Sequence, residues 1–181
     1  MASLLIGGQV QHIRALGPNA VTLRIRSRGA SRQLLLSADP SDARVHLITG
    51  RGESDAETNH FVMALRKHIE DGRLVECSQV GFDRIARFVV VNHGSTYRLM
   101  CECMGKHSNV LLLSADERIL DCIRHVGPSS NRLRRLLPGQ PYQSPPALTG
   151  TADLMSEAGR LELINGARLP ETERARWLQG R

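Results

Sequence analysis

Aromatic residues are scarce in this sequence, forming 3% of its 181 residues, so a core must be built mainly from Leu, Ile and Val. No stretch approaches the roughly 18 consecutive apolar residues that a transmembrane helix needs. The apolar run Leu4–Ile6 is short and follows no basic segment, so we expect no secretory signal peptide. Without such a signal, the four cysteines are best interpreted as reduced thiols of a cytoplasmic protein.

Motifs that mark common enzymes are also missing. The sequence contains no phosphate loop G-x-x-x-x-G-K-[ST], no dinucleotide fingerprint G-x-G-x-x-G and no G-x-S-x-G nucleophile elbow. Its seven histidines are scattered rather than paired four residues apart on a helix, as metal ligands would be. Cys101 and Cys103 could ligate a metal, but a single close pair is a poor zinc signature, and alternation predicts small buried hydrophobes on one strand face. We therefore expect no enzyme activity, no metal and no cofactor.

Positive charge is what the sequence does contain. Lys and Arg number 24 against 18 Asp and Glu, which gives a net charge of +6 and a pI of about 9.8. Every cationic residue except Lys67 and Lys106 is an arginine. Because the guanidinium group pairs with phosphate and stacks on bases, nucleic acid is one candidate partner. A GC-rich genome produces the same arginine bias, so composition leaves both interpretations open.

Short extended segments alternate with turns along most of the chain. Alternating apolar residues predict a strand over Val21–Arg28 with a cationic outer face. One helix interrupts the strands, because apolar residues recur at helical spacing over Phe61–Ile69. We expect the charge of His68 to stabilise the end of this helix. We expect Gly72 to end the helix in a left-handed turn. Other strands are predicted at Gln9–Ala15, Arg32–Ser37, Arg44–Ile48, Leu74–Gln79, Ile85–Asn92, Thr96–Glu102, Asn109–Ser114 and Ile119–His125. The pattern favours an α+β fold, an antiparallel β-sandwich with one inserted helix.

The composition changes after Val126, where Pro, Gly and Ser accumulate. Beyond this stretch, two short helices are predicted at Ala152–Ile164 and Pro170–Leu178. We place a β-rich domain at residues 1–147 and the start of a truncated helical domain at 148–181. A larger parent protein is the simplest explanation for a chain that stops just after a helix.

Two segments carry charged residues that could bind a ligand. On the predicted helix, Arg66 and Lys67 are expected to project outward as a positive face, although a solvated helix face is the commoner meaning of such residues. At the start of a predicted strand, Asp83 and Arg84 are adjacent. This pair could hold a turn, or it could present an arginine, oriented by its carboxylate, to phosphate or to a base.

A third segment is the polar loop 105–109 between two predicted strands. It contains Lys106, Ser108 and Asn109. Binding residues concentrate on loops that a rigid sheet holds, but a hairpin connection needs Gly and Asn in any case.

Taken in order, these segments belong to a longer series of motifs. The series is F-x-M-x-L-R-K-H, Q-x-G-x-D-R-I, Y-x-L-x-x-E-x-M-G-K-H-S-N, I-L-D and L-P-G-x-x-Y-x-x-P-P. It resembles the N-terminal domain of the NFACT proteins, the family of bacterial RqcH and eukaryotic NEMF, whose bacterial members were long labelled fibronectin-binding proteins. The resemblance runs from about Gly7 to Pro146.

The resemblance implies both a fold and a function. The fold is a β-sandwich similar to the N-terminal domain of formamidopyrimidine-type DNA glycosylases, followed by a helix–two-turn–helix-like segment. The function is an RNA-binding module of a quality-control factor that binds obstructed large ribosomal subunits carrying peptidyl-tRNA. Such factors recruit tRNA, alanyl-tRNA in bacteria, for template-free C-terminal tailing of the stalled chain.

The resemblance also carries residue roles. The family's Asp-Arg pair handles tRNA and falls on Asp83 and Arg84, and its Glu-x-Met falls on Glu102 and Met104. The full set of predicted RNA-binding residues is Asp83, Arg84, Glu102, Met104, Arg66, Lys67, Lys106 and Asn109.

Departures and rival functions remain beside this interpretation. Family members open with a helix before the G-G-x-V strand, whereas only Met1–Ile6 precedes Gly7 here, so that helix is shortened or missing. A DNA glycosylase would need a Pro-Glu start, which this chain lacks. An extracellular adhesin would need a secretion signal. We expect a cytoplasmic RNA-binding protein with no membrane partner and no small-molecule substrate.

Overall fold

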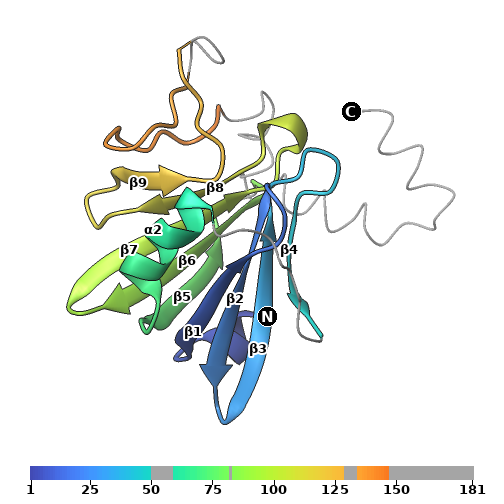
Figure 1. Ribbon diagram of the computed structural model, residues 1–181, viewed down its shortest axis with the longest axis vertical. Coiled ribbons are helices and arrows are strands. Elements are labelled where there is room, and N and C mark those ends of the chain that lie inside the picture. Colours follow the sequence, from blue (N-terminus) through green and yellow to red (C-terminus); the bar gives the residue numbers. More distant parts are fainter. Residues whose placement is uncertain (50–58, 82, 129–133, 147–181) are drawn as a thin grey trace, which may run out of the picture. The chain divides into compact units, whose positions relative to one another are not determined.

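The computed structural model describes residues 1–49, 59–81, 83–128 and 134–146, and this part of the chain contains one antiparallel sheet of nine strands (Figure 1). The strand order is β4-β3-β2-β1-β5-β6-β7-β8-β9. The predicted antiparallel arrangement is therefore confirmed. The strands are β1 (Gln9–Ala15), β2 (Ala20–Ser27), β3 (Ala30–Ser37), β4 (Arg44–Ile48), β5 (Arg73–Gln79), β6 (Ile85–Asn92), β7 (Ser95–Glu102), β8 (Asn109–Leu113) and β9 (Ile119–Cys122).

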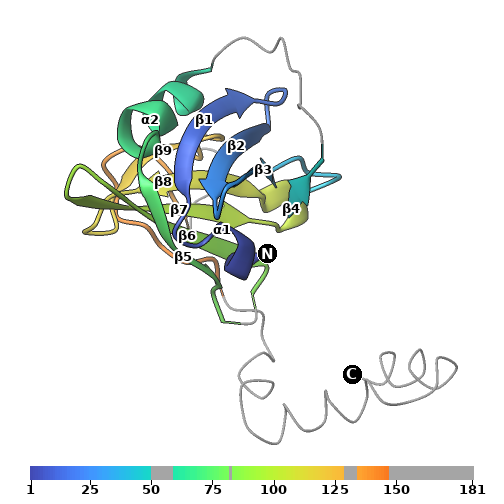
Figure 2. The ribbon, with the colours of Figure 1, turned by 90° about the horizontal axis from the view of Figure 1, so that it is seen from below.

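The sheet consists of two halves that are joined by a very short pairing. Strands β1–β4 form one half and β5–β9 the other, and the register between β1 and β5 is the single pair Gln9 and Arg73. The sheet curls so that β3 of the first half contacts β8 of the second (Figure 2). The two predicted layers are thus formed by one continuous sheet. Ile13, Leu34, Phe88 and Leu112 belong to the main hydrophobic core, to which both halves contribute.

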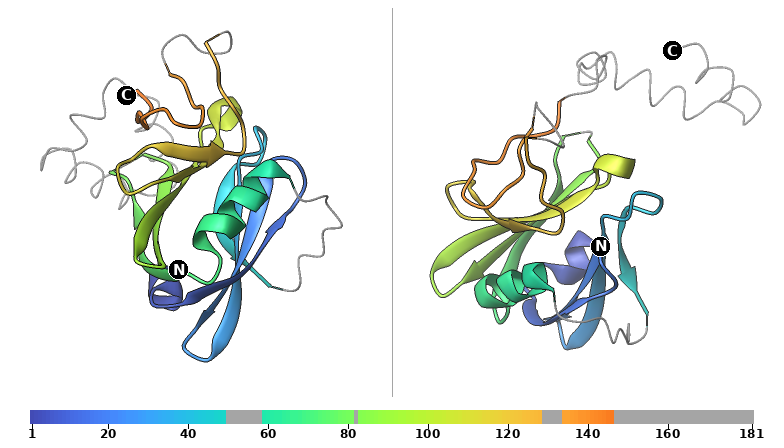
Figure 3. Two further views of the ribbon diagram at one scale, coloured as in Figure 1. Left: turned by 60° about the vertical axis from the view of Figure 1, so that its left-hand side comes forward. Right: turned by 45° about the horizontal axis from the view of Figure 1, so that its top comes forward.

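Helix α2 (His60–Ile69) lies between the two halves, as Figure 3 (left) shows. It contacts β1, β6 and β9. The Asn59 side chain caps its start by accepting the backbone N–H of Val62 at 2.9 Å. The apolar face that the sequence predicts is buried, since Phe61 and Ile69 are both almost closed to solvent.

The end of α2 differs from the prediction. Asp71, rather than Gly72, adopts the left-handed conformation, with φ at 64°. Gly72 is required for another reason: a Cβ atom there would lie 2.6 Å from Cγ1 of Val90 and 3.0 Å from Cβ of Asn92. A glycine at this position therefore permits close packing of the helix end on β6.

A short helix α1 (Ala2–Leu5) opens the chain, so the expected N-terminal helix is present in shortened form. Leu5 is fully buried in the main core. The compact unit runs from Met1 to Ser144. The predicted boundary at 147/148 and the two predicted C-terminal helices lie outside the described residues. None of the helices in the described ranges is long and apolar enough to cross a membrane.

Candidate functional site

The Asp83–Arg84 pair lies in the turn between β5 and β6, and its backbone is anchored on both sides. The amide of Asp83 donates to the carbonyl oxygen of Val80 at 3.2 Å, and Nε2 of Gln79 donates to the carbonyl oxygen of Asp83 at 2.8 Å. The carbonyl oxygen of Arg84 accepts the amide of Cys103 at 2.8 Å. The turn is thus held to the end of β7.

The side chains of this pair do not bond to each other. Among the described residues, the Asp83 carboxylate and the Arg84 guanidinium have neither a hydrogen bond nor an ion pair, with each other or with a third group. The predicted orientation of Arg84 by Asp83 through such a bond is therefore wrong in this conformation. Arg84 is exposed and lines a cavity of about 470 Å³. Its guanidinium is available to an anionic ligand.

Glu102 lies beside this turn but is closed to solvent. It pairs with Ile85 in the β6–β7 ladder and has an exposed fraction of 0%. Its carboxylate accepts Nη1 and Nη2 of Arg134 at 2.7 and 2.5 Å and the hydroxyl of Tyr142 at 2.8 Å. Burial, and then the Glu102 charge, raise the pKa of Tyr142. Glu102 therefore cannot contact RNA in this conformation, and its role is to hold the segment that contains Arg134 and Tyr142.

Met104 and Asn109 stabilise the loop that follows β7. Met104 is half-buried and packs against a second core cluster that includes Ile85. Asn109 is 1% exposed, and its Nδ2 atom donates to the carbonyl oxygen of Arg124 at 2.8 Å. The prediction that Asn109 contacts RNA therefore fails in this conformation, because both its burial and its hydrogen bonds fix it to the protein.

Lys106 remains exposed on the loop. It lies in the short 3-10 helix η1 (Gly105–His107), and its side chain is open to solvent. The Ser108 hydroxyl accepts the backbone N–H of Met104 at 2.8 Å and closes the loop. Pairing of Ile85 with Glu102 and the hydrogen bond from Cys103 to Arg84 thus hold the turn beside the end of β7, and the loop with Lys106 follows in the chain.

The two cations of α2 differ from each other. Lys67 is exposed, as predicted. Arg66 is half-buried, and its Nε and Nη2 atoms donate to the carbonyl oxygen of Ile13 at 2.9 and 2.8 Å. The prediction that Arg66 projects into solvent is wrong, because its guanidinium ties α2 to β1.

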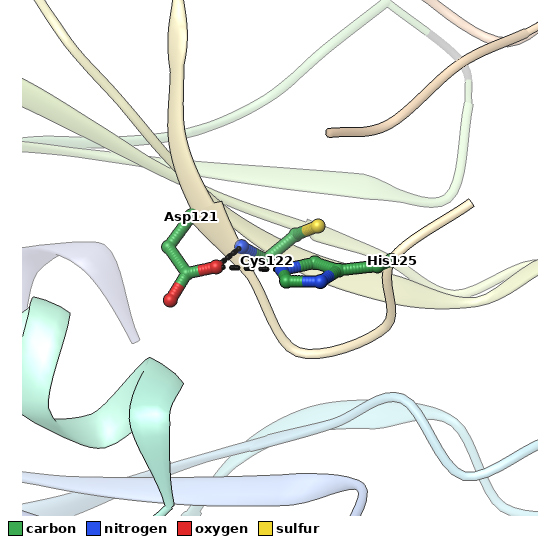
Figure 4. Close-up of side chains that lie close together, drawn as sticks. All are labelled: Asp121, Cys122 and His125. Atoms are coloured by element: carbon green, nitrogen blue, oxygen red, sulfur yellow. Dashed lines mark hydrogen bonds and ion pairs between the residues drawn. The ribbon is translucent and has the colours of Figure 1, made fainter. Parts of the chain in front are cut away.

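A cluster around Asp121 was not found by sequence reasoning. The Asp121 carboxylate is 2% exposed and lies 2.8 Å from Nδ1 of His60 and 2.9 Å from Nε2 of His125. Figure 4 shows the His125 ring turned toward Asp121, with Cys122 beside it. The motif I-L-D contained the signal, but the histidines come from a helix and a loop that the sequence does not place together.

The same cluster offers ligand types that zinc accepts. Donor atoms of Asp121, Cys122 and His125 lie within 4.8 Å of one another. The Cys122 thiol instead donates to the carbonyl oxygens of Arg124 and Leu136 at 3.3 and 3.4 Å. Burial, and then the charges of Asp121 and Glu102, raise the pKa of Cys122 to about 12. The contact of His60 with Asp121 thus links α2 with β9. The raised pKa keeps the Cys122 thiol protonated.

Comparison with known proteins adds a family match. The model of the family described as NFACT N-terminal and middle domains matches residues 1–180. The chain is 40% identical over 149 residues to the Rqc2 homolog RqcH of Bacillus subtilis, which covers 79% of this chain and 26% of that protein. It is 27% identical over 120 residues to the human ribosome quality control complex subunit NEMF, covering 66% of this chain and 11% of that protein.

Solved structures agree with this match. The N-terminal domain of the fibronectin-binding protein PavA from Streptococcus pneumoniae is 35% identical, with a TM-score of 0.80 over 91% of this chain and 64% of that one. The fibrinogen binding protein from Staphylococcus aureus is 27% identical, with a TM-score of 0.70 over 80% of this chain and 52% of that one. The chain spans about a quarter of the length of the bacterial RqcH relatives.

Proposed function

The chain belongs to the NFACT N-terminal and middle domain family, and we propose that it is the RNA-binding part of a ribosome quality-control factor. The proposal takes its general function from relatives whose names identify them as RqcH and as ribosome quality control subunits. Its partners are the large ribosomal subunit with peptidyl-tRNA and a recruited tRNA, alanyl-tRNA if the source is bacterial. It works in the cytoplasm, without catalytic chemistry of its own and without a membrane or small-molecule partner.

Arg84 is the residue on which the proposal mainly rests. Its guanidinium is exposed and unpaired within the described residues, yet its backbone is fixed by the hydrogen bond to Cys103. An exposed arginine on an anchored backbone forms charge-assisted hydrogen bonds with phosphate or with a base edge. Neutralised phosphates also release counterions, so the affinity should fall as salt rises.

Residues of the predicted site divide into contacts and supports. Exposed Lys106 and Lys67 add phosphate attraction to that of Arg84. Buried Glu102 and Asn109 support the loop and do not reach RNA in this conformation. Loss of either support would disturb RNA binding indirectly, through the position of the loop.

The proposal is tested by tRNA binding to the Arg84→Ala variant. Fluorescence anisotropy over a series of salt concentrations gives the affinity and its salt slope. We expect Arg84→Ala to lower the tRNA affinity about tenfold, the equivalent of about 1.4 kcal/mol. The matched control is Arg26→Ala on β2, which also removes one exposed arginine. Equal effects of the two variants would reject a specific role for Arg84.

A surface adhesin is the second candidate, since two structural neighbours carry names that refer to fibronectin or fibrinogen binding. Labelling of surface proteins on intact cells separates it from the first, because an RNA-binding factor of the cytoplasm stays unlabelled. The similarity to formamidopyrimidine-type DNA glycosylases remains a prediction about the fold. An abasic-site cleavage assay tests the corresponding activity, and we expect none.

A further inference from the structure

Two thiols meet where β7 ends beside Arg84. The Sγ atoms of Cys101 and Cys103 lie 4.0 Å apart. Cys101 is fully buried in the sheet, whereas Cys103 is half-buried and lines the same cavity of about 470 Å³ as Arg84. A small reagent in the cavity can therefore reach one thiol, and the second thiol stands in contact behind it.

The two thiols also differ in acidity. The hydrogen bond from Cys101 lowers the pKa of Cys103; burial opposes this effect, and the nearby Arg84 guanidinium adds to it. The same hydrogen bond, together with burial, raises the pKa of Cys101 well above its ordinary value. Cys103 is thus the nucleophile of the pair, and Cys101 is a protonated thiol next to it.

We propose that Cys101 and Cys103 form a reversible oxidation site that controls the Asp83–Arg84 turn. The oxidant is a peroxide, here hydrogen peroxide. The Cys103 thiolate attacks one peroxide oxygen, the O–O bond breaks, and Cys103 becomes a sulfenic acid while the second oxygen leaves as hydroxide and takes up a proton. The Cys101 sulfur then attacks the sulfenic sulfur, an S–S bond forms, and the hydroxyl group leaves as water with the Cys101 proton. A dithiol reductant returns both thiols.

Oxidation is coupled to the turn through the backbone. The sulfur atoms must approach each other by about 2 Å to bond, which moves the end of β7. The Cys103 amide on that segment holds the carbonyl oxygen of Arg84 at 2.8 Å, and the neighbouring Glu102 pairs with Ile85. The disulfide also removes the Cys103 thiol, whose pKa the nearby Arg84 guanidinium helps to lower. This regulatory effect rests on the proposed RNA-binding function, whereas the chemistry at the two thiols does not.

The chemistry is tested by mass spectrometry of the full chain. The reduced protein is exposed to near-stoichiometric hydrogen peroxide. It is then denatured in the presence of N-ethylmaleimide, which labels every thiol that is still free, and digested with trypsin. Both thiols lie on one tryptic peptide, Leu99–Lys106, and Cys122 lies on another, which serves as an internal control. With time in peroxide, we expect Leu99–Lys106 to appear without N-ethylmaleimide and two hydrogens lighter than the dithiol peptide, as a disulfide requires. This change should be about tenfold faster than the loss of N-ethylmaleimide labelling at Cys122. Equal rates on the two peptides would overturn the proposal.

Variants assign the order of the steps. In Cys101→Ala, oxidation should stop at a sulfenic acid on Cys103, which dimedone traps. In Cys103→Ala, Cys101 should resist oxidation. Cys77→Ala is the matched control, because Cys77 lines the same cavity and should leave the disulfide yield unchanged. Dimedone labelling of Cys101 in the Cys103→Ala variant would refute the assigned order, and circular dichroism checks that each variant is folded.

The regulatory effect is tested by tRNA binding before and after oxidation. We expect the oxidised chain to bind tRNA about fivefold to tenfold more weakly, with recovery after dithiothreitol and no response in Cys103→Ala. Equal affinity of the reduced and oxidised chains would overturn the coupling. If the reduced chain does not bind tRNA, the proposed function fails, and the mass measurement still decides the oxidation site independently.

Discussion

Glu102 and Arg134 are 32 residues apart and form a bidentate ion pair in which both side chains are almost fully buried. Arg134→Ala would leave the Glu102 carboxylate as a buried charge without its cation. We expect the free energy of unfolding to fall by about 3–5 kcal/mol. Denaturant unfolding followed by circular dichroism measures this loss.

The control for this pair is an exposed ion pair on the same domain. Arg118 lies 3.2 Å from Asp116, with both side chains more than half exposed. Arg118→Ala should cost no more than about 1 kcal/mol, because solvent screens the pair. A double variant, Glu102→Gln with Arg134→Met, should recover part of the loss, since it leaves no unpaired buried charge. Equal losses in Arg134→Ala and Arg118→Ala would contradict the assigned burial.

Gly72 gives a second prediction, based on space. A methyl group at Gly72 would lie 2.6 Å from Cγ1 of Val90, so the helix end and β6 must separate. Gly72→Ala should destabilise the domain by about 1–3 kcal/mol. Gly127→Ala is the matched control, because nothing lies within 4 Å of a Cβ atom there and its φ is not in the left-handed region. Similar unfolding midpoints for the two variants would show that β6 can move away from the added methyl group without loss of stability.

Arg66 and Lys67 are neighbours in sequence, but their substitution should have different effects, one on stability and the other on tRNA binding. Arg66→Met keeps the aliphatic stem but removes both hydrogen bonds to the carbonyl oxygen of Ile13, which should cost about 1–2 kcal/mol of stability. Lys67→Met removes an exposed charge and should change stability by no more than about 0.5 kcal/mol while it weakens tRNA binding. Unfolding and anisotropy measurements on both variants check this division. A greater loss of stability in Lys67→Met would reverse the assignment.

The local elements could be predicted because their signals are local. Alternation located the strands to within a few residues, and the helical spacing of apolar residues located α2. The predicted strand Ile119–His125 extends too far, since β9 ends at Cys122 and only Ile123 beyond it is apolar. The left-handed residue after α2 was also predicted wrongly. Gly72 is needed for close packing against β6, and Asp71 adopts the left-handed conformation instead.

Burial of the site residues could not be predicted in the same way. A charged residue in a motif is expected at the surface unless its partner is known, and Arg134, the partner of Glu102, lies 32 residues away. The same holds for Arg66, whose acceptor is a backbone carbonyl on β1. Family motifs point to this segment as a whole, but only tertiary contacts separate the exposed Arg84 from the buried Glu102.

His68 gives a prediction about pH, because it stands at the buried end of α2. Burial, and then the Lys67 charge, lower its pKa from the ordinary value of 6.5. The sequence-based expectation of a charged His68 at the helix end is therefore not supported, since the folded state favours the neutral ring. The unfolded chain binds the proton first as the pH falls, so stability is full above 6.5 and decreases below it toward the lowered pKa.

The variant His68→Phe isolates this contribution. Phenylalanine keeps a ring against Tyr97, whose ring centroid lies 5.2 Å from that of His68, but it cannot be protonated. Between about pH 8 and about pH 5 we expect the wild-type chain to lose more stability than the variant. Urea midpoints at each pH give the difference, in which the titration of other groups cancels. Parallel pH profiles for the two proteins would mean that His68 takes up its proton equally well in the folded and unfolded states.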